Sequence, residues 1–226
     1  MGLQKHVAAR VEAVMTEDGG DTQALVDSLR RGDSEPLAAL VSLHRERLRR
    51  MVEFRLDVRL RGRVSTSDVL QEAYIDALKR LPHFAADPDV PFYVWLRTVT
   101  IQRLIQVHRQ HLGAQARDAA REVSIGRSNG TEASSEKMAE LMGDLTSPSH
   151  AAERGEMRER VRGALERLEA ADREVLALRH FEELSNLEVA ALLGIQPAAA
   201  SKRYVRAIER LKNALEAGQP GHGGAE

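Results

Sequence analysis

The sequence predicts an all-α protein made of two small helical domains that a flexible linker joins, with a helix-turn-helix in the C-terminal domain. Apolar residues, mostly Leu, Ala and Val, recur at helical spacing over two long stretches of the chain. Aromatic residues make up only 4% of the sequence, a composition that suits small helical cores better than a β-sandwich. Between the two stretches the chain lacks strong periodicity and becomes rich in Ser, Gly and Asn, which predicts a linker. We therefore expect five parts: an N-terminal extension (1–20), an N-terminal domain (21–112), a flexible linker (113–152), a C-terminal domain (153–217) and a disordered tail (218–226).

The composition excludes several classes of protein. The formal net charge of −1 argues against a histone-like coat for nucleic acid, so any DNA contact must come from local basic faces. The absence of cysteine excludes disulfides, thiolate zinc sites and cysteine catalysis. No apolar run approaches the ~20 residues that a membrane helix needs, and the N-terminus lacks the apolar core of a signal peptide. We expect a cytoplasmic protein without a membrane partner.

Catalytic and cofactor-binding motifs are missing from the sequence. It contains no Walker motif, no dinucleotide glycine fingerprint and no nucleophile elbow. His108 and His111 lie one helical turn apart, but no carboxylate or third histidine is placed to complete a metal site. We interpret both histidines as surface residues. The protein is therefore expected to be no enzyme, with no cofactor, no metal and no small-molecule substrate.

The first part of the N-terminal domain is dense in arginine. Residues 43–63 contain eight arginines, with Leu48, Met51 and Leu56 among the apolar positions between them. This pattern predicts a helical hairpin whose exposed side is basic. Such a side is usually solvated, and a position near nucleic acid is the alternative.

A second helix is predicted from the capping residues at 64–68 to Leu81. Its buried side is expected to consist of Val69, Leu70, Ala73, Tyr74, Ala77, Leu78 and Leu81. Its other side is acidic with one exposed aliphatic residue, and it consists of Asp68, Gln71, Glu72, Ile75 and Asp76. Acidic residues near a helix N-terminus often only compensate the helix dipole, so an interaction surface is one of two interpretations.

A loop containing Phe84 is predicted over residues 82–91, followed by a segment without acidic residues. No Asp or Glu occurs in residues 90–117. The cations and aromatic residues of this segment are Arg97, Arg103, Arg109, Arg117, Phe92, Tyr93 and Trp95. Basic residues beside aromatic rings suit unpaired DNA, because bases stack and phosphates need cations. The alternative is an aromatic core with a solvated basic side, and Trp95 itself is expected in the core.

Residues 171–213 predict three short helices, of which the last two form a helix-turn-helix. Ser185 and Glu188 have the spacing of a capping box. Gly194 follows where a turn needs a residue that tolerates positive φ, and Pro197 suits a first helical position. The acidic pair before this motif, Glu182 and Glu183, lies at a helix end, where solvation explains both.

The last of these helices is strongly basic. Its apolar side is predicted to contain Ala200, Tyr204, Ala207, Ile208 and Leu211. Its opposite side and flanks carry Lys202, Arg203, Arg206, Arg210 and Lys212 against Glu209 alone. Small residues at its start would let the backbone approach a DNA groove closely. A solvated amphipathic helix is the alternative.

These segments resemble bacterial RNA polymerase sigma factors of the sigma-70 family, extracytoplasmic-function (ECF) type. The C-terminal match lies in Asp172-Arg-Glu-Val-Leu-Ala-Leu-Arg-His-Phe-Glu, Leu184-Ser, Glu188-Val-Ala, Leu193-Gly-Ile and Arg203 with Arg206-Ala. The N-terminal match lies in Asp68-Val-Leu-Gln-Glu-Ala-Tyr-Ile and in the block that begins at Pro91. Departures from the family pattern occur at Gln102, Gln106, Gln196 and Ala200. The resemblance covers most of the chain, with both matches in the family's order.

The resemblance implies a sigma factor that binds core RNA polymerase, recognises promoter DNA and helps to melt it. An anti-sigma protein is a further partner that the family admits. The implied polymerase-binding residues are Asp68, Gln71, Glu72 and Ile75. The residues implied for the minus-10 element are Phe84, Arg97, Gln102, Arg103, Gln106 and Arg109, with the loop 84–91 as the pocket for a flipped base. Those implied for the minus-35 element are Ala198, Ala199, Ser201, Lys202, Arg203 and Arg206.

A different class of protein also contains such a C-terminal motif. A helix-turn-helix regulator with an N-terminal sensing or dimerisation domain would explain residues 171–213 equally well. It would leave the acidic face around Glu72 and the segment around Trp95 unexplained.

Overall fold

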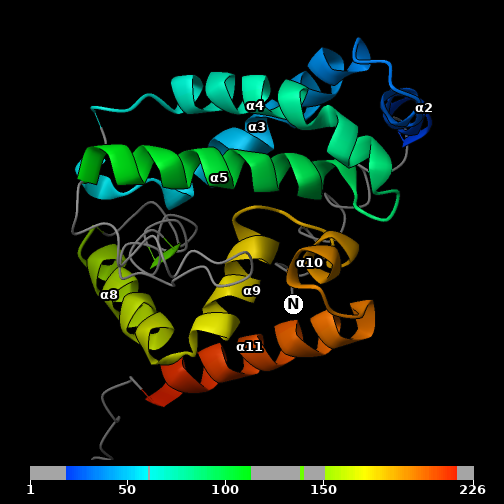
Figure 1. Ribbon diagram of the computed structural model, residues 1–226. Coiled ribbons are helices and arrows are strands. Elements are labelled where there is room, and N and C mark those ends of the chain that lie inside the picture. Colours follow the sequence, from blue (N-terminus) through cyan, green and yellow to red (C-terminus); the bar gives the residue numbers. More distant parts are fainter. Residues whose placement is uncertain (1–18, 61, 113–137, 140–150, 218–226) are drawn as a thin grey trace, which may run out of the picture.

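The computed structural model describes residues 19–60, 62–112, 138–139 and 151–217, and its elements are helices (Figure 1). The N-terminal domain consists of α2 (Gly19–Arg30), α3 (Pro36–Arg55), the short 3₁₀ helix η1 (Val58–Leu60), α4 (Thr66–Ala86) and α5 (Phe92–Leu112). The C-terminal domain consists of α8 (Ala151–Arg167), α9 (Ala170–His180), α10 (Asn186–Leu193) and α11 (Pro197–Ala217). The all-α prediction is therefore confirmed.

The end of α4 differs from the prediction. Ser65 caps the helix as expected, because its hydroxyl accepts a hydrogen bond from the Ser67 N–H at 3.2 Å. The predicted loop over residues 82–91 is wrong in its first half, since α4 continues through Pro82 to Ala86. Proline inside a helix removes one backbone hydrogen bond. Burial of Phe84, two residues after Pro82, offsets that loss by packing the last turn onto the core.

The predicted signals of the helix-turn-helix are confirmed as local structure. Ser185 accepts from the Glu188 N–H at 3.2 Å, and the Glu188 carboxylate accepts from the Ser185 N–H at 2.7 Å. Gly194 ends α10 with φ of 62°, which L-residues with a side chain rarely adopt. Pro197 is the first residue of α11. Ile208 is exposed rather than buried, in contrast to the prediction for this helix.

The two domains pack against each other over one continuous core. Figure 1 shows α5 between the layer of α3 and α4 and the C-terminal helices, with α11 on the outer side. Helix α5 contacts α3 and α4 within its own domain and α10 of the other domain, and α11 packs on α8, α9 and α10. The sequence predicted two small domains joined by a flexible linker and not how they pack, so this packing is a finding of the structure. Of the predicted linker (113–152), Met138 and Ala139 are described as helical and buried in this core, and Ala151 and Ala152 already belong to α8.

The remaining predictions about chain organisation lie largely outside the described residues. These are the N-terminal extension, most of the linker and the C-terminal tail. Among the described helices, none combines the length and the apolar character that crossing a membrane requires.

Candidate polymerase and DNA interfaces

The four predicted polymerase-binding residues form one exposed stripe along α4. Counted from Asp68, the other three residues follow at three, four and seven positions: Gln71, Glu72 and Ile75. This spacing places them on one side of a helix, and all four are exposed. Ile75 exposes 44% of its surface. Leu78, which the sequence predicted as buried, exposes 40% and extends the apolar part of this stripe. The α4 stripe therefore combines negative charge with accessible aliphatic surface.

The α4 stripe is connected to the predicted minus-10 segment by Arg103 of α5. The Arg103 Nε donates to Asp76 Oδ2 at 2.8 Å, and a second guanidinium nitrogen contacts the same oxygen. Arg103 Nη1 also lies 3.4 Å from Glu72 Oε2. This guanidinium therefore neutralises part of the charge on α4 instead of pointing freely into solvent.

Gln102 lies at the edge of a surface hollow between α4 and α5. Its side-chain oxygen accepts a hydrogen bond from Arg80. The hollow is lined by Arg80, His83, Trp95, Thr98, Val99 and Gln102. Gln106 and Arg109, the other predicted DNA contacts on this helix, are exposed. The hollow thus offers an aromatic ring, an amide and a cation at one place.

Phe84 does not lie in an exposed loop, and that prediction is wrong. Its side chain is only 1% exposed, because α4 continues past it and turns the ring toward α5. The ring centroid lies 5.5 Å from that of Phe92 in an edge-on arrangement and 4.8 Å from that of Trp95. The Arg30 guanidinium covers the ring at 4.6 Å. Phe84 is therefore a core residue in this structure.

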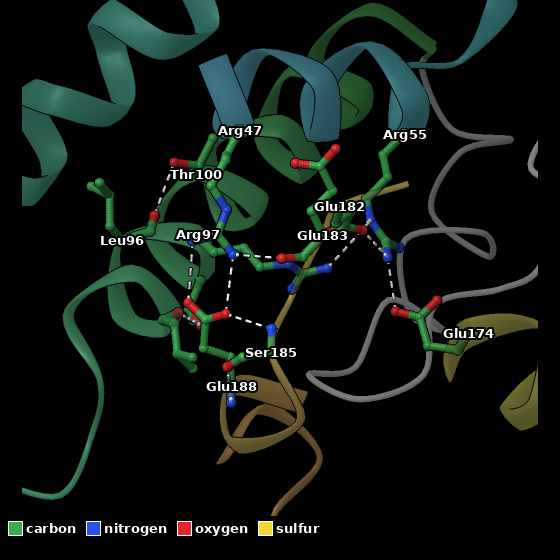
Figure 2. Close-up of polar contacts among 12 residues, drawn as sticks. Arg47, Arg55, Leu96, Arg97, Thr100, Glu174, Glu182, Glu183, Ser185 and Glu188 are labelled. Atoms are coloured by element: carbon green, nitrogen blue, oxygen red, sulfur yellow. Dashed lines mark hydrogen bonds and ion pairs between the residues drawn. The ribbon is translucent and has the colours of Figure 1, made fainter. Parts of the chain in front are cut away.

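Arg97, a further predicted DNA contact, is also withdrawn from solvent. It is 5% exposed and forms a two-point ion pair with Glu182 of the C-terminal domain. Arg97 Nε donates to Glu182 Oε2 at 2.6 Å, and its Nη2 donates to Glu182 Oε1 at 3.1 Å (Figure 2). The sequence interpretation of Glu182 as a solvated residue is wrong, because domain packing leaves it 0% exposed.

Arg55 completes an interdomain cluster that we define as Arg55, Arg97, Glu174 and Glu182. Arg55 Nε donates to Glu182 Oε1 at 2.6 Å, and its Nη2 donates to Glu174 Oε1 at 2.8 Å (Figure 2). Burial alone would raise the pKa of Glu182, but the charges of Arg55 and Arg97 and their hydrogen bonds hold it well below its usual range. The carboxylate is consequently ionised at neutral pH although it is fully buried.

A second set of contacts joins α3 to the start of α10. Arg47 Nη2 lies 3.1 Å from Glu188 Oε2 and donates to the Glu183 carbonyl oxygen at 3.2 Å. Arg50 Nη2 donates to Glu183 Oε2 at 2.7 Å. The sequence left open whether these arginines are solvated or near nucleic acid, and the structure pairs them with acids of the other domain. Glu188 thus caps α10 and pairs with α3 at the same time.

An aromatic contact accompanies the ion pairs. The rings of Phe54 and Phe181 are stacked, with centroids 5.3 Å apart and planes inclined by 4°. The Arg47 guanidinium lies over the Tyr93 ring at 3.7 Å. The packing of the domains therefore has an apolar component beside its charges.

His44 of α3 is placed beside this contact and supplies a pH-dependent contribution. Its ring centroid lies 5.2 Å from that of Tyr93. The pKa of His44 is lowered to about 4. Burial is the largest cause, the charge of Arg47 acts in the same direction, and the charge of Glu188 opposes both. The folded protein therefore disfavours the imidazolium form.

We expect acidification to destabilise the protein through His44. A group whose folded pKa is depressed from 6.5 to about 4 binds its proton more readily in the unfolded chain. The stabilising contribution is complete above pH 6.5 and falls by up to about 3 kcal/mol as the pH decreases toward 4. Denaturant unfolding at several pH values should show this slope, and the variant His44→Gln should show a flatter one. Equal slopes in the two proteins would contradict the assignment to His44.

The predicted minus-35 residues lie on the outer helix α11. Ala198, Ala199, Ser201, Lys202 and Arg206 are exposed, and Arg203 is half-buried. Figure 1 shows α11 on the side of the molecule away from α5. Arg210 is different, because it pairs with the buried Asp172 of α9 and stabilises the fold. The start and middle of α11 therefore present a basic surface that the domain packing leaves accessible.

Of the two histidines that the sequence assigned to the surface, His108 has a structural role. His108 is half-buried, and its Nε2 accepts a hydrogen bond from the Asp57 N–H at 3.3 Å. Across the part of the chain that the structure describes, no three His, Cys, Asp or Glu side chains are grouped so that they would hold a metal ion.

Comparisons with known proteins agree over most of the chain. The family model described as "ECF sigma factor" matches residues 20–217. The RNA polymerase sigma-H factor of Pseudomonas aeruginosa is 28% identical over 200 residues, covering 86% of this chain and 93% of that protein. The ECF RNA polymerase sigma factor SigD of Mycobacterium tuberculosis is 27% identical over 217 residues, covering 96% and 94%. Among solved structures, CnrH in complex with the cytosolic domain of CnrY matches with 24% identity and a TM-score of 0.47, covering 87% of this chain and 97% of that chain.

Proposed function

Since the chain belongs to the ECF sigma factor family and so acts with RNA polymerase in transcription initiation, we propose that three of its surfaces divide this work. The α4 stripe binds core RNA polymerase. The exposed part of α5 around Gln102 acts at the minus-10 element, and the outer side of α11 acts at the minus-35 element. The single observation that carries the proposal is that all four residues of the α4 stripe are exposed, although the helix itself is well packed.

The α4 stripe has the character of a protein-binding surface. Ile75 and Leu78 are large aliphatic residues one turn apart on the exposed side of α4, and they stand beside the acidic positions. Buried neighbours on the other side of α4, such as Val69 and Ala77, fix the helix, so the stripe is presented rigidly. A basic partner surface with an apolar centre would complement it.

Fewer residues are accessible for contact with melted DNA than the sequence predicted. Gln102, Gln106 and Arg109 are accessible, and Trp95 with Arg80 borders the hollow beside Gln102. An amide beside an aromatic ring suits a single unpaired base, which can stack and form hydrogen bonds at its edge. We assign Phe84 a supporting role in the core below this surface. Arg97 and Arg103 become DNA contacts only after their present ion pairs are exchanged.

We assign the functional units to the two domains with the boundaries expected from the sequence. Residues 21–112 act on polymerase and the minus-10 element, and residues 153–217 act on the minus-35 element. A regulator with a separate N-terminal sensing domain is not favoured, because the family match extends across both domains. Sigma factors are non-enzymatic DNA-binding proteins, so we assign the chain no reaction of its own, and we place it with the polymerase in the cytoplasm.

The polymerase assignment is tested by reversing charge on the α4 stripe. The double variant Asp68→Lys and Glu72→Lys should bind purified core polymerase roughly tenfold or more weakly, because like charges would face each other across the interface. Its helical circular dichroism and melting temperature should stay close to those of the original protein, since exposed charges contribute little to folding.

A matched control carries the same change in charge elsewhere in the N-terminal domain. Asp21 and Asp27 are exposed on α2, and the double variant Asp21→Lys and Asp27→Lys should leave the affinity for core polymerase unchanged. If the α4 variant binds as tightly as the control, the α4 stripe is not the polymerase surface.

A further inference from the structure

A groove of about 430 Å³ lies between α3 and α4, with residues of α5 at its floor. The three helices pack on one another, and Figure 1 shows α3 and α4 as the layer on one side of α5. Small-molecule sites in proteins usually have volumes of about 300–1,000 Å³, so the groove is large enough for a ligand. It is separate from the hollow beside Gln102, because the two have no lining residue in common.

The floor of the groove is apolar. Its buried lining residues come from all three helices, and they are Leu48, Leu70, Ala73, Leu96 and Thr100. The Thr100 hydroxyl donates to the Leu96 carbonyl oxygen at 2.9 Å, so it is already satisfied within α5. A polar group placed on this floor would lose its hydration without gaining a partner. The part of a ligand that reaches the floor must therefore be apolar.

The rim of the groove carries polar side chains that other described residues do not engage. These are Ser42, Arg45, Ser67, Gln71 and Tyr74, of which Tyr74 is half-buried and the others are exposed. Ser42 and Arg45 lie one turn apart on α3, and Gln71 and Tyr74 lie one turn apart on α4. Across the described part of the chain, none of these side chains forms a hydrogen bond or an ion pair. An apolar floor below several unengaged polar groups is the usual composition of a small-molecule site.

Arg45 supplies the charge of the groove and differs from the other arginines of α3. Each of the others pairs with a carboxylate, and they are Arg47, Arg49, Arg50 and Arg55. Arg45 has no such partner among the described residues. Its neighbour Glu46 is engaged by Arg49 through hydrogen bonds of 2.7 and 3.0 Å. A free guanidinium beside an apolar floor complements a ligand with an anionic head and an apolar body.

The charges around the groove favour a head group with a single negative charge. Arg45 is the one cation among the described residues that line the groove. Asp68 and Glu72 directly follow two residues of the rim in the sequence, although neither lines the groove itself. A phosphate dianion would therefore be only partly neutralised and would be repelled by the acidic residues of α4. A carboxylate carries one charge and matches the fork of a guanidinium.

We propose that the groove between α3 and α4 is a binding site for a small amphipathic carboxylate. The carboxylate accepts hydrogen bonds from the Arg45 guanidinium and the Ser42 hydroxyl at the rim. The apolar body of the ligand covers Leu48, Leu70 and Leu96 on the floor. The ligand is bound without reaction, so the site adds a binding activity to the proposed function and does not depend on it.

Two probes of the same shape test the predicted chemistry. Octanoate has an anionic head on a short apolar chain, and octanamide replaces that head by a neutral one. Titration of each probe against the full chain, followed by ligand-detected NMR, should show saturable binding of octanoate at least about tenfold tighter than that of octanamide, because only octanoate forms a charge-assisted pair with Arg45. Equal affinities of the two probes, or no saturable binding of octanoate, overturn the proposal.

A pair of arginine variants tests the position of the head group. Arg45→Gln should weaken octanoate binding by about tenfold or more and leave octanamide binding nearly unchanged. Arg31→Gln removes an exposed arginine that does not line the groove, and it should change neither affinity. Both residues are exposed, so the melting temperatures of the two variants should stay close to that of the original protein. Equal loss of octanoate binding in the two variants overturns the assignment to Arg45.

A second pair of variants tests the position of the apolar body. Ala38 lines the groove and Ala39 does not, although both are exposed neighbours on α3. Ala38→Trp should cover part of the groove and weaken the binding of both probes, whereas Ala39→Trp should have no effect on either. Equal affinities of these two variants for octanoate would show that the probe binds elsewhere, and the proposal would be overturned.

These outcomes are distinct from failure of the proposed function. Every probe measurement uses the free chain, without polymerase or DNA. Gln71 lines the groove and also belongs to the α4 stripe, so it is left unchanged in all variants. Loss of polymerase binding in the α4 charge reversal therefore tests the proposed function alone, and octanoate binding tests the groove alone.

Discussion

Replacing Phe84 by Ala is expected to lower the free energy of unfolding by about 3–5 kcal/mol, as for other fully buried aromatic residues. The side chain fills the space between Phe92 and Trp95, and no water has access to it. The substitution also removes the packing that keeps the last turn of α4 helical after Pro82. Denaturant titration followed by circular dichroism would measure the loss.

Two further variants separate the core role of Phe84 from a contact with DNA. Phe84→Leu keeps most of the apolar volume and should retain stability to within about 1.5 kcal/mol, together with normal transcription. Gln102→Ala changes a partly exposed residue and should impair promoter opening without comparable loss of stability. If Phe84→Leu folds stably but fails to open promoters, the ring acts on DNA and the core interpretation is wrong.

The sequence predicted correctly those parts of the fold that depend on residues a small, fixed number of positions apart. A hydroxyl and a carboxylate three positions apart satisfy the same two backbone groups wherever they occur, so Ser185 and Glu188 could be assigned without the structure. The turn at Gly194 and the start at Pro197 follow equally local rules. The exposed positions of the α4 stripe were predicted for the same reason, from helical periodicity alone.

The parts that sequence rules missed depend on partners far away in the chain. Glu182 and Glu183 are neighbours of the same type, yet one is fully buried and the other is exposed. The difference arises because Arg55 and Arg97, 127 and 85 positions away, converge on Glu182 and not on Glu183. No local pattern encodes that convergence. The only related signal was the excess of arginine in residues 43–63, which was interpreted as a solvated side or a side near nucleic acid and not as a set of partners for distant acids.

The end of α4 was missed for an energetic reason. Proline inside a helix costs about 3 kcal/mol or more, so Pro82 predicted a break. Burial of an aromatic ring contributes a comparable amount, and Phe84 is placed where it offsets the cost. The helix end predicted at Leu81 from local propensity is therefore wrong, because tertiary packing outweighs the cost of Pro82.

The largest effect on promoter recognition is expected from the double variant Arg203→Ala and Arg206→Ala. Arg206 is exposed and Arg203 is half-buried on α11, while Ala200, Ala207 and Leu211 fix the helix in the core. An arginine that contacts guanine contributes roughly 1–3 kcal/mol of discrimination. Loss of two such contacts should lower the affinity of the holoenzyme for promoter DNA by about thirtyfold or more.

The salt dependence of that loss identifies what each arginine contacts. If the contacts are to phosphate, binding weakens for all sequences alike, and the slope of log affinity against log salt decreases by about one for each lost contact. If they are to bases, the slope changes little and the preference at one minus-35 base pair relaxes. Lys212→Ala, on the same helix but near its C-terminal end and exposed, is the control for loss of charge alone and should have a small effect. Wild-type affinity of the double variant at every salt concentration would show that α11 does not recognise the promoter, and the role assigned to the C-terminal domain would have to move to another of its helices.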